Sequence, residues 1–254
     1  LDEQGELVTA LNTEDVEHGP AGRDGKAGEA MNEAALISAL KTAPRDGLVT
    51  DLGGFQVFVQ QISLPPHAIV VGGGHIGEAL TAILKNLRWK VTVVEPREMF
   101  AAPGRFQAAD GVLHLWPGEA FEQLGLNSGL DPGREMGFSR GLRSKQQAAA
   151  ADLTVPPRYT AVAAITHTEQ IDDAAVALGI RNGCFSVGVL GSTRTFSARI
   201  SRLKERGFTD EELGRVHGPI GLDIGAGTPE EIALAIAAEM VQDYRSARRT
   251  ENRG

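Results

Sequence analysis

The pattern of apolar and polar positions divides this chain into two parts. Up to about residue 62 the pattern is weak, and it predicts only a short helix at 31–42 and a half-exposed strand at 54–62. From His67 onward, apolar runs of strand length alternate with amphipathic segments of helix length. This alternation is typical of a parallel sheet that is covered by helices.

The second part contains five strand signals and five helix signals. Strands are predicted at 67–72, 90–95, 111–116, 159–166 and 184–191. Helices are predicted at 77–87, 118–124, 170–178, 194–206 and 228–244. Together they predict an α/β fold, with a Rossmann-like, doubly wound and mainly parallel sheet over 63–254 and a short appendage over 1–62.

Two segments depart from this pattern. Residues 1–30 combine Gly, Asp and Glu without periodicity, and we expect a mobile acidic leader there. Residues 117–157 begin like a helix and continue with Gly, Pro and basic residues, which predicts an irregular insertion. No apolar run approaches the roughly 20 residues that a membrane span needs, so no membrane association is predicted.

Charge and cysteine content narrow the class of protein. The net charge of the 254 residues is −8, and 1–35 hold nine acidic and two basic residues, which gives −7 of it. Basic residues gather only in the tail YRSARRTENRG, so we predict no nucleic-acid partner. The only cysteine, Cys184, excludes internal disulfides and a multi-cysteine metal site, and we expect a buried structural thiol. The start of the sequence does not resemble a signal peptide, and a cytoplasmic location is expected.

A glycine cluster after the first predicted strand is the main candidate for chemistry. The spacing Gly72-x-Gly74-x-x-Gly77 follows a strand and opens a helix, as a dinucleotide-binding turn does. In that interpretation Gly72 allows the tight turn, Gly74 allows the backbone to approach a phosphate, and Gly77 allows close packing of helix and strand. Glu95 ends the second strand, where an acceptor for a ribose hydroxyl belongs. The alternative is a glycine turn that serves packing alone.

Further polar residues follow the carboxyl ends of other predicted strands. Arg97 could hold a phosphate group, or it could pair with Glu95 or Glu98. The segment LGSTRT at 190–195 combines a glycine, hydroxyls and a guanidinium, although helix capping alone would explain the hydroxyls. Asp223 lies between glycines and could contact a ligand or tie down its turn.

Two histidines, His75 and His167, also follow strands at the edge where open α/β sheets bind ligands. We expect polar contacts with a ligand from them rather than a metal site, and no catalytic residue is assigned. The candidate cofactor-binding residues are Gly72, Gly74, His75, Gly77, Glu95, Arg97, His167, Gly191, Ser192, Arg194 and Asp223. We predict that the glycine turn, His75, Glu95, His167, Ser192, Arg194 and Asp223 line one crevice.

Several segments resemble the xanthine dehydrogenase accessory proteins (the XdhC/CoxI family). They read VFVQQISLPPHAIVVGGGHIG, VTVVEPR, AAITHTEQIDDAAV and VGVLGSTRTFSARISRLKERGFTDEELGRVHGPIGLDIGAGTPEEIALAIAAEMV, in this order. The resemblance covers about 57–243 apart from the insertion, and the last segment is the most specific. Residues 1–56 contain no counterpart of the glycine-rich stretch ending in SGGCVE that the family's N-terminal domain typically carries.

The resemblance implies a function as well as a fold. The family binds the molybdenum cofactor (molybdopterin) as cargo, protects it during sulfuration by a cysteine desulfurase, and delivers it to an apo-molybdenum hydroxylase. A chaperone of this kind, expected here as a homodimer, performs no bond-making step of its own. The alternatives are an NAD(P)-dependent oxidoreductase and a scaffold that has lost its ligand. An oxidoreductase would need a proton donor, and His167 is the only candidate for that role.

Overall fold

The computed structural model describes residues 46–52, 55–60, 64–101, 103–126 and 156–251, and it divides into two units between Leu64 and Pro65. The first unit contains an antiparallel pair, β1 (Asp46–Leu52) and β2 (Phe55–Gln60). Strand β2 confirms the strand that the alternation predicted, whereas β1 was not predicted. The predicted leader, the helix at 31–42 and residues 127–155 of the predicted insertion lie outside the described residues.

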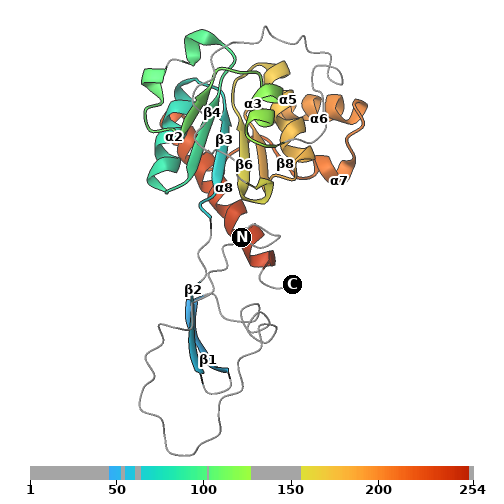
Figure 1. The fold of residues 1–254 in the computed structure, drawn as a ribbon. Helices are drawn as coiled ribbons and strands as arrows, with labels where there is room; N and C mark the ends of the chain where they lie inside the picture. The colour runs from blue at the N-terminus through green and yellow to red at the C-terminus, as the bar shows by residue number, and fades with distance from the viewer. Residues whose placement is uncertain (1–45, 53–54, 61–63, 102, 127–155, 252–254) are drawn as a thin grey trace, which may run out of the picture. The chain divides into compact units, whose positions relative to one another are not determined.

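The second unit is built on six parallel strands in the order β5-β4-β3-β6-β7-β8 (Figure 1). The strands are β3 (His67–Val71), β4 (Lys90–Val94), β5 (Gly111–Leu113), β6 (Thr160–Ala164), β7 (Ser186–Val189) and β8 (Val216–His217). This sheet confirms the Rossmann-like fold class. Strand β8 was not predicted, because its two residues are too few to produce an alternation.

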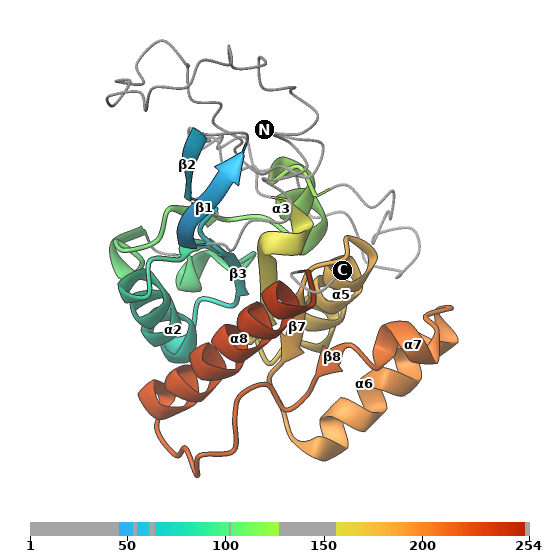
Figure 2. The same cartoon turned by 90° about the horizontal axis from the view of Figure 1, so that it is seen from below.

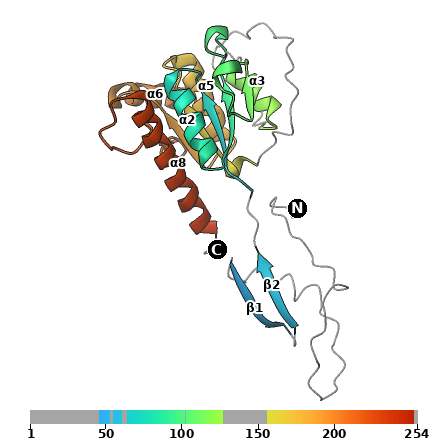
Figure 3. The ribbon, with the colours of Figure 1, turned by 90° about the vertical axis from the view of Figure 1, so that its left-hand side faces the viewer.

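Helices cover both faces of the sheet. They are α2 (His75–Asn86), α3 (Pro117–Gln123), α5 (Glu169–Arg181), α6 (Thr193–Glu205), α7 (Asp210–Leu213) and α8 (Pro229–Glu251), with short 3-10 turns η2 (Glu98–Phe100), η3 (Pro103–Arg105) and η4 (Pro157–Tyr159). Helices α2 and α8 lie side by side (Figures 2 and 3) and share one core, while α3 and α5 contribute to the other. Among the described helices, none has the length and apolar character needed to cross a membrane.

Strand β3 shows why the first strand signal is an unbroken apolar run. Ala68 and Val70 point into the core with α2 and α8, whereas Ile69 and Val71 point into the core with α5. Successive side chains of a strand face opposite sides, so a strand covered on both faces needs apolar residues at every position. All four are fully buried.

The strand order defines where a ligand can bind. From β3 the chain builds outward through β4 and β5, and it then returns to place β6 on the other side of β3. In doubly wound sheets a crevice opens at this reversal, outside the carboxyl ends of the two central strands. The turns that follow β3 and β6 therefore flank the expected ligand crevice.

Candidate functional site

The glycines of the turn after β3 have different steric requirements. Gly72 has a φ of +134°, and a Cβ there would lie 2.9 Å from the carbonyl carbon of Ile165. A Cβ at Gly77 would lie 2.1 Å from the carbonyl oxygen of Gly72. A Cβ at Gly74 would meet no atom within 4 Å, and Gly74 has an ordinary φ of −74°. The turn itself thus requires Gly72 and Gly77, whereas Gly74 borders open space.

Glu95, directly after β4, is completely buried beneath this turn. Its two carboxylate oxygens accept hydrogen bonds from the backbone N–H of Gly73 at 2.8 Å and of Arg97 at 2.9 Å, and from Nε and Nη2 of Arg97 at 2.7 Å each. Burial opposes ionisation, but the hydrogen bonds from Arg97 and Gly73 outweigh it and lower the pKa of Glu95. Glu95 therefore anchors the turn, and its oxygens already have four donors.

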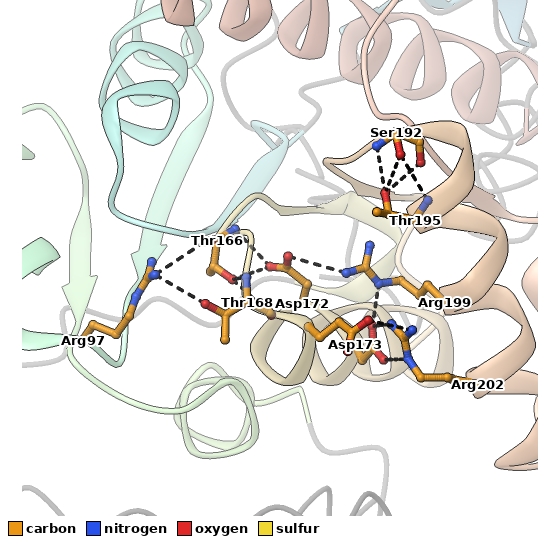
Figure 4. Close-up of polar contacts among 10 residues, drawn as sticks. Arg97, Thr166, Thr168, Asp172, Asp173, Ser192, Thr195, Arg199 and Arg202 are labelled. Carbon is orange, nitrogen blue, oxygen red and sulfur yellow. Dashed lines mark hydrogen bonds and ion pairs between the residues drawn. The ribbon is translucent and has the colours of Figure 1, made fainter.

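Of the partners that the sequence allowed for Arg97, the structure shows Glu95. Arg97 also reaches the turn after β6. Its Nη1 lies 3.5 Å from the carbonyl oxygen of Thr166 and 3.5 Å from Oγ1 of Thr168 (Figure 4). Its guanidinium carbon lies 4.6 Å from the centre of the Phe100 ring. Arg97 thereby connects the ends of β4 and β6 on either side of β3.

Arg105, in η3, is a contact of the glycine turn that the sequence did not indicate. Its Nη1 donates to the carbonyl oxygen of Gly73 at 2.9 Å, and its Nη2 pairs with Oε2 of Glu78 at 2.9 Å. Glu78 lies in the first turn of α2. No local pattern marks Arg105, because its partners lie far away in the sequence and η3 has no periodicity of its own.

The turn after β6 holds His167 in an uncommon backbone conformation. His167 has a φ of +61° and an exposed side chain. Thr166 lies beneath it, and its N–H and Oγ1 donate to Oδ1 of Asp172 at 3.0 Å and 2.7 Å. Asp172 is 1% exposed, and this burial raises its pKa. Non-glycine residues with positive φ persist only where the surroundings impose them, and they concentrate at functional sites.

Buried charges extend this network from α5 into α6 (Figure 4). Arg199 is 5% exposed, and it donates from Nε to Oδ1 of Asp173 at 2.5 Å while Nη2 lies 3.6 Å from Oδ2 of Asp172. Arg202 donates from Nε to the second oxygen of Asp173 at 2.9 Å. The network fixes α6 against α5, and in sequence these residues look like the polar side of two ordinary amphipathic helices.

The turn after β7 is fixed by its own residues. Gly191 has a φ of +151°, and Ser192 and Thr195 form a capping box at the start of α6, in which each side chain binds the backbone N–H of the other. This box gives the hydroxyl of Ser192 a structural purpose. Arg194 is exposed in the first turn of α6.

The loop between β8 and α8 carries Asp223, which is exposed. The loop is tied to α8 by Glu239, which accepts from the backbone N–H of Gly221 and lies 2.6 Å from Nδ1 of His217. Asp243 adds a second carboxylate, with Oδ2 3.7 Å from the same histidine nitrogen.

All candidate residues follow carboxyl ends of parallel strands and share one edge of the sheet. Hydrogen bonds join the glycine turn, Glu95, Arg97 and the His167 turn. Within the described residues, no hydrogen bond or ion pair joins Arg194 or Asp223 to that group. Likewise, none of the described His, Cys, Asp and Glu residues form a group of three or more that could hold a metal ion.

Cys184 lies just before β7, at the opposite end of that strand from Ser192. Its side chain is 1% exposed, and burial raises the pKa of its thiol to about 12. The prediction of a buried structural thiol is confirmed. A thiol that remains protonated and inaccessible is a poor nucleophile and a poor metal ligand.

A doubly wound sheet with a glycine turn at its switch point defines a Rossmann-like domain. The model of the XdhC Rossmann domain matches residues 68–240. The chain belongs to this family of XdhC Rossmann domains, as the sequence resemblance predicted.

Individual proteins with similar sequences or folds are consistent with that assignment. The chain is 25% identical over 204 residues to the uncharacterized protein YqeB of Escherichia coli (strain K12), covering 80% of this chain and 32% of that protein. It is 24% identical over 186 residues to a probable xanthine dehydrogenase subunit of Bacillus subtilis (strain 168), covering 73% of this chain and 45% of that protein. A solved structure described as a xanthine dehydrogenase from Bacillus halodurans has the same fold, with a TM-score of 0.53 and 22% identity. The match covers 74% of this chain and 47% of that chain. The chain spans less than half the length of each of these three proteins.

Proposed function

We propose that this chain assists the maturation of a molybdenum hydroxylase of the xanthine dehydrogenase type by holding and delivering its phosphate-bearing molybdenum cofactor. Membership of the XdhC family and the name of the Bacillus subtilis relative support the link to xanthine dehydrogenase. An apo-hydroxylase, a cysteine desulfurase and a second copy of the chain are the partners that this proposal includes.

The observation that carries the proposal is the open space beside Gly74. A Cβ at Gly72, Gly73 or Gly77 would clash with neighbouring backbone atoms. Gly74, by contrast, borders open space at the N-terminus of α2. There the first N–H groups of the helix lack intrahelical partners, and the helix dipole favours an anion. A phosphate group fits this arrangement because it can approach the backbone without meeting a side chain.

The charges around the turn favour reversible rather than very tight binding of an anionic cargo. Arg97 is paired with Glu95 and Arg105 with Glu78, so neither guanidinium offers an uncompensated charge to a ligand. Binding would then rest on backbone N–H groups and a dipole contribution of about 0.3–1 kcal/mol. Such a site suits a carrier that must release its cargo.

The chain's own residues would bind and shield the cargo, not modify it. The only thiol in the sequence, Cys184, is buried at the other end of β7, so it cannot accept sulfur at the proposed site. Sulfuration would therefore depend on the partner desulfurase. His75 and His167, both exposed at this edge, are the candidates for polar contacts with a pterin.

The test compares wild type with Gly74→Leu and with Ala82→Leu, which adds similar bulk at an exposed position of α2. All three are purified anaerobically, mixed with the molybdenum cofactor and analysed for bound pterin and molybdenum. We expect wild type and Ala82→Leu to bind, and Gly74→Leu to lose binding while its free energy of unfolding falls by no more than about 1 kcal/mol, the cost of a poorer N-cap. Wild type that binds no molybdopterin but transfers hydride with NAD(P) would be an oxidoreductase instead. Wild type with neither property would act as a scaffold.

A further inference from the structure

We propose that Arg105 is a positioning residue: it sets the orientation of the peptide between Gly73 and Gly74, and thereby the direction in which the Gly74 N–H is offered to a phosphate group. The inference rests on the proposed function, because it concerns the same turn. It assigns a role to a residue that lies outside the glycine fingerprint, on a separate segment of the chain.

Both polar groups of Gly73 are held by side chains from elsewhere. Its N–H donates to Oε2 of Glu95 at 2.8 Å, and its carbonyl oxygen accepts from Nη1 of Arg105 at 2.9 Å. In a planar trans peptide the carbonyl of one residue and the N–H of the next point in opposite directions. Because Arg105 holds the Gly73 carbonyl, the Gly74 N–H must point away from the guanidinium.

Arg105 can impose this direction because it is itself fixed to the helix that the turn opens. Its Nη2 and Nε contact Oε2 of Glu78 at 2.9 Å and 3.2 Å, and its guanidinium lies over Phe106, 5.8 Å from the ring centre. The planar fork of an arginine can serve a carboxylate and a carbonyl at the same time, which an ammonium does less well. Its positive charge is compensated by Glu78, so its effect on a ligand acts through the backbone.

Without this bond the peptide is free to turn over. Two consecutive glycines have no Cβ to restrict rotation. In the reversed orientation the carbonyl oxygen of Gly73 would face the phosphate, and two negative partial charges would repel each other. Loss of Arg105 should therefore weaken binding by more than its distance from the ligand would suggest.

The experiment measures the Kd for molybdopterin in wild type and four variants. Arg105→Ala should raise the Kd about tenfold, the value of one hydrogen bond, and Arg105→Lys should recover part of the loss. Glu78→Gln removes the charged partner of Arg105, but it also removes a carboxylate that repels an anion at the start of α2, so the Kd should change by less than about threefold. Arg88→Ala removes the same charge beyond the other end of α2 and should bind like wild type.

Two results would overturn the inference. An Arg105→Ala protein that binds with unchanged Kd would show that the carbonyl contact sets nothing. An Arg105→Lys protein that binds as tightly as wild type would show that Arg105 acts by its charge alone, since lysine keeps the charge but not the planar fork.

A second measurement tests the role of Arg105 independently of the proposed function. In glycine-labelled protein, inorganic phosphate is titrated while the amide resonance of Gly74 is followed. If wild type binds no molybdopterin, the proposed function fails. The Arg105 role is then supported if phosphate shifts the Gly74 amide in wild type and not in Arg105→Ala, and it is rejected if both proteins respond alike.

Discussion

The turns after β3 and β7 join a parallel strand to a helix at the same edge of the sheet, yet they are held in opposite ways. Gly73 of the first turn is fixed by Glu95 and Arg105, which are 22 and 32 positions away in sequence. The second turn is fixed by Ser192 and Thr195, three positions apart. The first turn therefore depends on the whole fold, whereas the second needs only its own residues.

This difference has a consequence for ligand binding. A turn held from outside keeps its N–H groups oriented before a ligand arrives, so less ordering is needed on binding. A turn held by local capping can exchange its internal hydrogen bonds for bonds to a ligand. For the phosphate binding proposed above, the glycine turn would thus be the pre-organised half of the edge, and the first turn of α6 with Arg194 would be the adaptable half.

The largest expected effect comes from adding a methyl group where the fold closes around the glycine turn. Gly77→Ala places a Cβ 2.1 Å from the backbone oxygen of Gly72, and that oxygen cannot move without shifting the end of β3. We expect a loss of about 3 kcal/mol in the free energy of unfolding, measured in urea. Gly74→Ala is the matched control; because Gly74 is the N-cap of α2 and its Cβ would meet open space, it should cost no more than about 1 kcal/mol. Equal stability of the two variants would contradict the close packing.

A smaller effect is expected from weakening the support beneath the turn. Glu95→Gln keeps the shape of the side chain but leaves Arg97 without its carboxylate and presents an amide to some of its four donors. We expect a loss of about 2 kcal/mol, reduced from the cost of breaking a fully buried pair because the Arg97 side chain is 34% exposed and water can solvate it. Glu98→Gln, at an exposed position, is the control and should be nearly neutral in the same urea titration.

Removing the local support of the second turn should cost less again. Ser192→Ala deletes the cap of α6, and such caps are worth about 1 kcal/mol. Ser201→Ala removes a hydroxyl that bonds only within the exposed face of the same helix, and it should have little effect. A loss at Ser192 as large as that at Glu95 would mean that the second turn is also held from outside.

The same contrast explains what the sequence could predict. Strands β3, β4, β6 and β7 are buried on both faces, so their apolar runs identify them and fix the fold class. The glycine turn at Gly72, Gly74 and Gly77 was predicted from its spacing. Residue type predicted a hydroxyl cap for α6 but did not decide between Ser192 and Thr193, and the structure places the cap at Ser192. Arg105 and the Asp172 to Arg199 network could not be predicted, since each joins segments whose proximity exists only after folding. Strand β8 is too short to leave a pattern, and α8 continues beyond residue 244 through polar residues that lack an apolar stripe.

The smallest effect concerns a third turn, the loop after β8, which is held by a contact that titrates. The hydrogen bond to Glu239 raises the pKa of His217, and the negative charge of Asp243 raises it further, although burial opposes both. A raised pKa means that the protonated form favours the folded state, so the full contribution is present below the ordinary value of 6.5 and is lost as the pH rises through the raised value.

The free energy of unfolding should therefore fall between pH 6.5 and about 8, below the range in which unfolded Cys184 ionises, by less than about 1 kcal/mol because the His217 side chain is 37% exposed. Over this range the Glu95–Arg97 pair keeps its charges, since the pKa of Glu95 is lowered and that of Arg97 is raised. Burial lowers the pKa of His67 to about 4. Its contribution to the free energy of unfolding therefore changes only below pH 6.5, where it rises with pH instead of falling. Urea titrations of wild type and His217→Gln across this range isolate the β8 loop. A decline of the same size in both proteins would assign it to another group.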